Sequence, residues 1–362
     1  MKLMEPREVF EPEAGTIYLD AATYGLPPRP TVEVMRQALA DWQAGSADWV
    51  TGWDKAGETA RQRFAQLIGA DAEAIALVPS ASVGVGTVAA SLEHGDEVVL
   101  PDDEFTSVLY PLLVAQQARG IVVRRAPFEH LAEAVGSQTK LVACSLVQSQ
   151  SGRTIDLARV LEAAEGAGAR TLIDATHGVP FVPVQIERVD YLVCAAYKHL
   201  LCPRGVAFLY VRRAWWSDVP PILANWRSAR DPYGHFYGGE LDLAGTAARF
   251  DVSLAWFPWL GASVSLDLLT TWQRSGHLQQ VNELARRLAR NLDLPQPIST
   301  VLSVPVQEDA ERVRASLAEQ GIRGAVRAGS VRLAPHVYNT RDEIDRAAQV
   351  LAPFVSRAPA IA

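Results

Sequence analysis

Cysteine is scarce in this 362-residue sequence, which has three, none in a CxxC pair and none beside a cluster of histidines. This scarcity excludes a disulfide framework and a cysteine-based zinc site, so we expect reduced thiols in a cytoplasmic protein. The opening stretch, MKLMEPREVFEPEAG, carries charges where a secretion signal needs an apolar core. No apolar run reaches the roughly 18 residues that a membrane-spanning helix needs. We therefore expect no membrane partner.

A basic tract is also missing. Lys and Arg number 34 against 41 Asp and Glu, which gives a formal net charge of -7. This balance argues against a nucleic-acid partner, because nucleic-acid-binding proteins concentrate positive charge on one face. The hydrophobic content of 49% and the charged content of 21% are typical of a globular protein. The length is sufficient for one large domain and one smaller domain.

Seven short apolar runs occur between residues 74 and 211, with helical patterns between several of them. Because apolar and polar residues do not alternate within the runs, each is predicted to be a strand buried on both faces. Helical patterns such as SVLYPLLVAQQARG end in glycine. This order predicts an α/β domain with a mainly parallel sheet and helices on both faces. The predicted strands are 74–79, 96–101, 120–126, 140–147, 170–174, 190–196 and 206–211.

The pattern changes near residue 270, beyond which helices and short strands predict a small α+β unit. We expect a large domain over residues 16–270 and a small domain over residues 1–15 and 271–362. The stretch 212–250 has little periodicity and is predicted to be a long functional loop. The small unit is predicted to have helices at 277–291, 309–321 and 340–355, a strand at 299–306 and short strands within 323–333.

Polar residues follow several of the predicted strands. Ser80-Ala81-Ser82 follows the first strand and opens a helix, Ser149 follows the fourth, Asp174 ends the fifth and Tyr197-Lys198 follows the sixth. In an open α/β sheet, ligands bind beyond the carboxyl ends of the strands. An acid, a lysine and a helix N-terminus suited to phosphate are therefore expected to meet at one edge of the sheet.

Lys198 is the most informative of these residues, because lysine is seldom buried unless it is paired or chemically engaged. Pyridoxal phosphate requires a lysine amine for its Schiff base and a carboxylate beside its pyridine nitrogen. It also requires an anion site for its phosphate, which a helix N-terminus with serine hydroxyls supplies. The residues alone leave two interpretations open: a pyridoxal-phosphate site, or a structural ion pair between Lys198 and a carboxylate.

A dinucleotide site is a competing interpretation of GVGTVA at residues 84–89, which fits the GxGxxA pattern and precedes Asp102 and Asp103. In that motif the first glycine lies in the turn that directly follows the strand. Gly84 instead lies six residues past the predicted strand, inside the next helix. Close packing of this helix on the sheet explains the glycines better, so we reject the dinucleotide site.

Four segments, in this order and at these spacings, resemble the class V aminotransferase family of fold-type I pyridoxal-phosphate enzymes. The resemblance implies a large α/β domain with a mainly parallel seven-stranded sheet, and a small α+β C-terminal domain. The third segment is the most specific of the four. The segments are YLDAATYGLPP at 18–28, GDEVVLPDDEFTSVLYP at 95–111, LIDATHGVPFVPVQIERVDYLVCAAYKHLLCPRGVAFLYV at 172–211 and VRLAPHVYNTRDEID at 331–345.

The resemblance assigns roles to individual residues around the cofactor ring. Lys198 matches the Schiff-base lysine, and Asp174 matches the partner of the pyridine nitrogen. His177 matches a residue near the phenolic oxygen, and Phe105 matches a ring that stacks on the pyridine face. Ser149 stands where many members carry Asn beside the ring.

Other matches concern the phosphate and the substrate. Ala81 and Ser82 match the residues that cradle the phosphate, and Tyr197 occupies a position that is often His. Ser253 matches, less well, a Thr of the partner subunit that completes the phosphate site, so a homodimer with a shared active site is implied. Arg332 matches the arginine that grips the α-carboxylate of the amino-acid substrate, which suits the bidentate geometry of a guanidinium.

The reaction type depends on which branch of the family the chain resembles. Desulfurases carry a nucleophilic cysteine on a loop before the carboxylate-binding arginine, whereas only RAGSV leads up to Arg332 here. The chain is more similar to the branch with isopenicillin-N-epimerase-like and carbon–sulfur lyase-like enzymes. We therefore expect β-elimination from a bulky S-substituted cysteine. The alternatives are transamination or decarboxylating deamination of a similar amino acid, or a scaffold that binds the cofactor without turnover.

Overall fold

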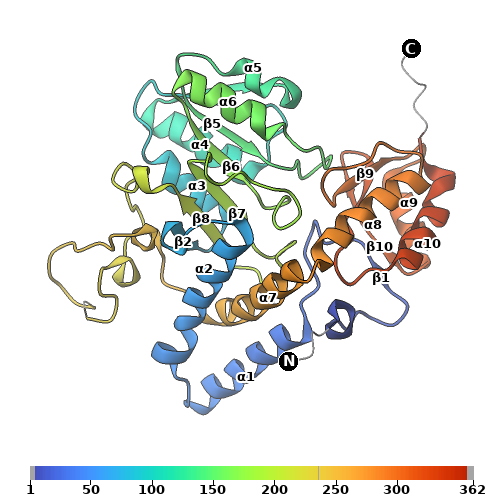
Figure 1. Cartoon of the computed structure of the whole chain (residues 1–362), viewed down its shortest axis with the longest axis horizontal. Coiled ribbons are helices and arrows are strands. Elements are labelled where there is room, and N and C mark those ends of the chain that lie inside the picture. The colour runs from blue at the N-terminus through green and yellow to red at the C-terminus, as the bar shows by residue number, and fades with distance from the viewer. Residues whose placement is uncertain (1–4, 235, 357–362) are drawn as a thin grey trace.

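The computed structural model describes residues 5–234 and 236–356, and a seven-stranded sheet forms its centre (Figure 1). The strand order is β2-β8-β7-β6-β5-β3-β4. Only β8 runs antiparallel to its neighbours, so the prediction of a mainly parallel sheet is confirmed. The strands are β2 (Ile75–Val78), β3 (Glu97–Pro101), β4 (Val122–Ala126), β5 (Thr139–Ser145), β6 (Arg170–Asp174), β7 (Tyr191–Ala195) and β8 (Ala207–Val211).

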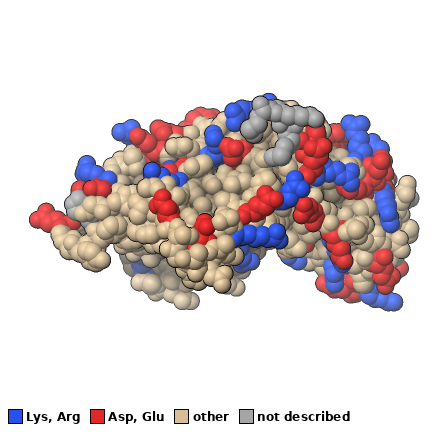
Figure 2. Space-filling model, turned by 90° about the horizontal axis from the view of Figure 1, so that it is seen from below, with Lys and Arg blue, Asp and Glu red and all other residues tan. Residues whose placement is uncertain are grey.

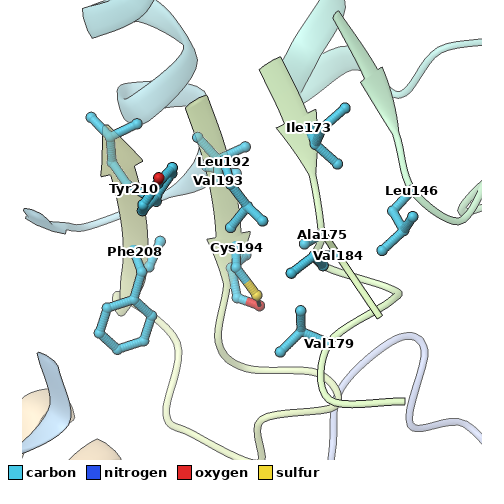
Figure 3. Packing of buried hydrophobic residues seen from close by; sticks show 14 of the residues in the cluster. Leu146, Ile173, Ala175, Val179, Val184, Leu192, Val193, Cys194, Phe208 and Tyr210 are labelled. Carbon is cyan, nitrogen blue, oxygen red and sulfur yellow. Dashed lines mark hydrogen bonds between the residues drawn. The ribbon is translucent and has the colours of Figure 1, made fainter. Parts of the chain in front are cut away.

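The central strands are buried on both faces, as their apolar runs predict. Figure 3 shows Ile173 of β6, Val193 of β7 and Phe208 of β8 within one hydrophobic cluster. On one face, the ring of Phe64 stacks on Phe208 with centroids 4.1 Å apart. Gly84 lies in the helix Ala81–Ala89, which packs on the sheet, and a Cβ at this position would lie only 2.7 Å from Cγ1 of Val193. This glycine therefore serves close helix–sheet packing, as expected.

Most helices of the large unit end at a glycine in the left-handed conformation, which lets the backbone leave the helix without a Cβ clash. Gly45, Gly69, Gly120 and Gly168 have this role, with φ between 68° and 74°. The helices are α1 (Arg29–Ala44), α2 (Lys55–Ile68), α3 (Ala81–Ala89), α4 (Thr106–Arg119), α5 (Leu131–Ala134), α6 (Leu157–Ala167) and α7 (Trp256–Arg274).

The sequence patterns do not predict α7, because Pro258 and Gly261 both disfavour helix. Pro258 lies in the first turn, where a missing backbone N–H breaks no helical hydrogen bond. Gly261 allows close packing, since a Cβ there would lie 2.6 Å from Cγ of Pro203. Tertiary packing against α1 and α2 therefore outweighs the local preference.

A second hydrophobic cluster belongs mainly to the C-terminal elements, which lie at the right of Figure 1. Antiparallel strands β11-β12-β9 form its sheet, and β1 (Ile17–Tyr18) pairs with β10 in parallel. Ile17 and Leu19 belong to this cluster, and α8 contributes to both clusters. The domain boundary near 270 stays a prediction, and we propose to place it at the junction of α7 and α8. The elements are α8 (His277–Asn291), β9 (Leu302–Pro305), α9 (Ala310–Glu319), β10 (Ile322–Arg323), β11 (Ala325–Arg327), β12 (Ser330–Leu333) and α10 (Arg341–Leu351).

Charges of both signs are interspersed over the face of the molecule that Figure 2 shows. No helix within residues 5–234 and 236–356 has the length and apolar character needed to cross a membrane.

Candidate active site

Lys198 lies three residues beyond the end of β7 (Tyr191–Ala195), at the carboxyl edge of the sheet, and only 6% of it is exposed. Its Nζ lies 2.8 Å from Nε2 of His177 and can donate a hydrogen bond to it. Burial lowers the pKa of Lys198 to about 8, against a smaller opposing effect of Asp174. Burial also lowers the pKa of His177 well below its usual value, with Lys198 adding to the effect. At neutral pH His177 is therefore an uncharged acceptor beside the amine.

Asp174 is the last residue of β6, the neighbour of β7, and it is buried. Its Oδ1 accepts a hydrogen bond from the backbone N–H of Thr176 at 2.9 Å. The hydroxyl of Thr176 accepts in turn from the N–H of Ala195 at 2.9 Å, which links the ends of β6 and β7. Burial raises the pKa of Asp174, opposed by the Thr176 hydrogen bonds and by Lys198. An adjacent cationic group would keep this carboxylate ionised.

The N-terminus of α3 faces the same cavity. Ser80 caps this nine-residue helix, with its Oγ accepting from the N–H of Val83 at 3.4 Å. The Ser80 and Ser82 hydroxyls lie 3.0 Å apart. Free backbone N–H groups, the helix dipole and two hydroxyls make this end of the cavity suited to an anion.

These groups line one cavity of about 170 Å³. Eight of the ten predicted site residues line it, and Arg332 and Ser253 do not. Ser253 is exposed, so its predicted role in a partner's phosphate site stays a prediction. The eight residues are Ala81, Ser82, Phe105, Ser149, Asp174, His177, Tyr197 and Lys198.

Phe105 presents a partly exposed ring to the cavity, with the Lys198 Nζ 5.4 Å from the ring centroid. The preceding residue, Glu104, is buried, and its carboxylate accepts from the N–H of Phe105 at 2.7 Å and of Ser145 at 2.8 Å. Burial raises the pKa of Glu104 to about 7, against the lowering by these hydrogen bonds. Glu104 therefore fixes the backbone that carries the Phe105 ring. Glu104 is not recognisable from the sequence, because an acid in PDDEF resembles a solvated charge.

Arg332 lies in β12 and is 1% exposed. One terminal nitrogen, Nη1, donates to the carbonyl oxygen of Ser149 at 2.6 Å, and Nη2 donates to the hydroxyl of Thr23 at 2.8 Å. Its Nε has no hydrogen-bond partner among the described residues, although it is buried. Arg332 thus retains a donor for a ligand, and Ser149 connects it to the rim of the cavity.

The N-terminal segment closes over the loop that carries Lys198. The N–H of Gly25 donates to the carbonyl oxygen of Tyr197 at 2.9 Å. A Cβ at Gly25 would lie 2.3 Å from the carbonyl oxygen of Lys198, so no larger residue fits without a shift of the backbone. Thr23 and Gly25 are in the segment that carries the family resemblance, but their contacts are not predictable from spacing alone.

Two further histidines, His199 and His336, lie behind the lysine, and no sequence pattern marks them as part of the site. His336 Nδ1 accepts from the N–H of Val337 at 2.9 Å, so its proton is on Nε2, which donates to the carbonyl oxygen of His199 at 3.0 Å. Both rings are fully buried, and burial lowers the pKa of each. A neutral His336 therefore holds the backbone of the loop that follows Lys198, whereas the ring nitrogens of His199 have no hydrogen-bond partner among the described residues.

The arrangement fits pyridoxal phosphate. Lys198 offers a desolvated amine for covalent attachment, and Asp174 offers a buried carboxylate for the pyridine nitrogen. The N-terminus of α3 offers an anion site for the phosphate, and the ring of Phe105 offers a stacking surface. The alternative of a structural ion pair is not supported, because Lys198 has no carboxylate within 4.0 Å among the described residues.

Comparisons with known proteins agree with this fit. A family model described as aminotransferase class-V matches residues 17–346. Isopenicillin N epimerase of Streptomyces clavuligerus is 30% identical over 336 residues, which cover 81% of this chain and 83% of that protein.

Two solved structures share the fold, each at 21% sequence identity. One is a C-DES variant with glycine covalently linked to its PLP cofactor, with a TM-score of 0.86 over 97% of this chain and 100% of that chain. The other is the cystine C–S lyase C-DES with its product cysteine persulfide, with a TM-score of 0.84 over 95% of this chain and 99% of that chain. The match of the family model and the identity to the epimerase show that this chain belongs to the class-V aminotransferase family of pyridoxal-phosphate enzymes.

Proposed function

We propose that this enzyme catalyses β-elimination from a bulky S-substituted cysteine, with water consumed and a thiol, pyruvate and ammonia released. Membership of the family makes this chain a pyridoxal-phosphate enzyme that acts on an amino acid. The main support for elimination, a base-catalysed reaction, is the desolvated amine of Lys198, held 2.8 Å from a neutral histidine at the carboxyl edge of the sheet.

Lys198 suits the role of a general base at the α-carbon. When bound, pyridoxal phosphate supplies the electron sink that makes the α-proton of an amino acid acidic. A pKa of about 8 is close to neutral pH, where a base is both available and strong enough to take a proton. His177 holds the amine in place by accepting its hydrogen bond. Arg332 orients the substrate by its α-carboxylate, which fixes the bonds at the α-carbon relative to Lys198.

A reaction through a cysteine persulfide on the enzyme is not favoured. All three cysteines, Cys144, Cys194 and Cys202, are buried, and burial raises the pKa of each thiol. The turn before Arg332 consists of Ala328 and Gly329, so it offers no thiol nucleophile. The sulfur leaving group is therefore proposed to come from the substrate.

The test is to incubate the purified holoenzyme with an S-alkyl cysteine and to measure pyruvate and free thiol. Equal amounts of both would support elimination. Formation of an oxo acid together with a new amino acid would indicate transamination instead of elimination. Release of carbon dioxide would indicate decarboxylating deamination. Appearance of the D-amino acid would indicate epimerisation, the activity that the Streptomyces relative is named for. No product, with the cofactor bound, would favour the scaffold.

We also propose that the enzyme is a cytoplasmic homodimer. Tyr110 and Val114, on one face of α4, are 59% and 62% exposed, although both are large and apolar. Such residues are more often found at an interface than on a free surface. Light scattering coupled to size exclusion tests the dimer, and a mass near 39.3 kDa, that of one chain, would contradict it.

The proposed location in the cytoplasm rests on the cysteines. All three thiols are free, which agrees with a reducing compartment.

A further inference from the structure

A tight hairpin carries two arginines to the mouth of the site. β11 and β12 are joined by Ala328 and Gly329, whose φ angles of 46° and 74° are typical of a two-residue hairpin turn. The turn fixes the pairing of Ala325 with Arg332 and of Arg327 with Ser330. Opposite residues in an antiparallel pair share a face, and the diagonal neighbours on it lie close enough for long side chains to meet. Arg327 and Arg332 are such diagonal neighbours.

Both guanidinium groups reach the same side chain of the N-terminal segment. The hydroxyl of Thr23 accepts a hydrogen bond from Nη2 of Arg332 at 2.8 Å and from Nη2 of Arg327 at 3.4 Å. Two like charges at one neutral hydroxyl repel each other, and the effect is visible in the pKa of Arg332, which burial and Arg327 lower to about 10. An anion bound beside the two guanidinium groups would offset this repulsion.

The protein itself supplies little of that negative charge. Oδ1 of Asp20 lies 3.7 Å from Nη2 of Arg332, and burial raises the pKa of this aspartate. Arg327 is exposed and has no carboxylate within 4.0 Å among residues 5–234 and 236–356. The α-carboxylate of a substrate would engage Arg332, whose buried Nε is without a partner in the described part of the chain. One cation, Arg327, would still lack an anion.

We propose that the side chain of the substrate carries a second carboxylate, and that Arg327 binds it while Arg332 binds the α-carboxylate. This inference rests on the proposed function in one respect: if elimination is the reaction, the leaving thiol carries the second carboxylate, as in an S-carboxyalkyl cysteine. Arg332 and Arg327 then bind the two carboxylates of a dianionic amino acid, and the two-residue turn sets the spacing of the two guanidinium groups.

The principal alternative is that both arginines bind the same α-carboxylate. The two arrangements differ in a measurable way. A second site for a distal carboxylate makes Arg327 important only for dianionic ligands, whereas a shared α-carboxylate site makes it equally important for all ligands. Binding of simple acids separates these cases without any turnover.

The first experiment compares glutarate with pentanoate, which has the same number of carbons and one carboxylate, by calorimetric titration of the holoenzyme. We expect glutarate to bind more tightly by roughly tenfold to hundredfold, as a charge-assisted hydrogen bond to a carboxylate provides. Arg327→Gln should reduce this ratio to below threefold, whereas Arg332→Gln should weaken both acids. The matched control is Arg312→Gln, which removes one exposed arginine from α9 and should keep the wild-type ratio.

Equal binding of the two acids by the wild type, or an equal loss of both in Arg327→Gln, would overturn the inference. If neither acid binds measurably, the affinity of the wild type for S-carboxymethyl-cysteine is compared with its affinity for the isosteric S-carbamoylmethyl-cysteine. The change in cofactor absorbance on binding measures both affinities. A preference below threefold for the charged compound would overturn the inference. Preference for dianions without release of pyruvate would keep this inference and reject elimination, so the two failures are distinguishable.

Discussion

The Nζ of Lys198 lies 2.8 Å from Nε2 of His177, and both groups are buried beyond the carboxyl ends of β6 and β7. The imidazole is neutral because burial lowers its pKa, so it accepts from the amine and does not repel it. This contact holds the lysine at the point where Asp174, the α3 N-terminus and Phe105 converge. A lysine that is desolvated and held by a neutral acceptor is a reactive amine.

Lys198→Ala is expected to abolish covalent attachment of the cofactor and to reduce turnover by about 10²- to 10⁴-fold, the usual contribution of a general base. Borohydride reduction followed by peptide mass spectrometry checks the attachment site directly. Lys140→Ala, which removes an exposed lysine from β5, is the control and should leave the labelled peptide unchanged. A label on any other lysine would refute the assignment.

Covalent capture of added cofactor by the apoenzyme is expected to accelerate as pH rises from 6 to about 8 and then to level off. Burial lowers the pKa of Lys198 from 10.5 to about 8, so the neutral amine, which is the nucleophile, becomes the main form above that pH. Stopped-flow absorbance measures the rate. A rate that keeps rising towards pH 10 would mean that the lysine retains the pKa of a solvated amine.

Asp174→Asn is expected to lower kcat by on the order of 10²-fold, because it removes the charge that keeps the pyridine nitrogen protonated while preserving shape. The N–H of Thr176 still has an oxygen acceptor in the variant, so the ends of β6 and β7 should stay linked. Cofactor content, read from absorbance after gel filtration, should therefore remain above half of the wild-type value. Loss of the cofactor together with kcat would indicate a binding role instead.

Arg332→Lys is expected to raise KM for the amino acid by roughly 10- to 150-fold, equivalent to about 1.5–3 kcal/mol for a lost charge-assisted hydrogen bond. A lysine keeps the charge but cannot reproduce the contacts to Ser149 and Thr23 and also bind a carboxylate. Steady-state kinetics and the cofactor dissociation constant check this. An equal loss of cofactor affinity would contradict a role confined to the substrate.

Asp251→Ala is expected to destabilise the fold by about 3–5 kcal/mol, because it removes a buried carboxylate that lies beside both Arg61 and Arg227 and leaves Arg61 paired with the half-exposed Glu58. Nη2 of Arg61 lies 2.5 Å from Oδ2 of Asp251, and both side chains are buried. Asp251 Oδ1 also accepts from the N–H of Leu77 in β2 at 2.8 Å. Urea unfolding of the holoenzyme measures the effect, and Glu283→Ala, which breaks an exposed pair with Arg290, should change stability far less.

The strands were predictable because each apolar run lacks alternation, which is the signature of burial on both faces. Local sequence preferences gave no prediction for elements whose formation depends on tertiary packing. Pro258 and Gly261 argue against α7, and only contacts with α1, α2 and Pro203 make that helix favourable. The predicted strands from 323 to 333 are present, but their pairing into one hairpin depends on the left-handed conformation of Ala328, a residue type that rarely adopts it.

Residues of the site were predictable where they end a strand or begin a helix, as Asp174, Lys198 and Ser82 do. Glu104 was not, because its burial depends on Ser145, a residue 41 positions later in the chain. The contact of Thr23 with Arg332 was not predictable for the same reason. Arg332 itself was assigned by resemblance, since a lone arginine in a short strand carries no signal of its own.

The residues of the cofactor cavity lie between positions 79 and 206, whereas Thr23 and Arg332 are 309 positions apart. During synthesis on the ribosome, the residues that line the cofactor cavity emerge while the hairpin with Arg327 and Arg332 is still untranslated. The residues proposed to select the amino acid are therefore the last part of the site to be translated. The cavity is also incomplete until then, because His336, in the same segment, bonds to the carbonyl oxygen of His199 in the loop after Lys198.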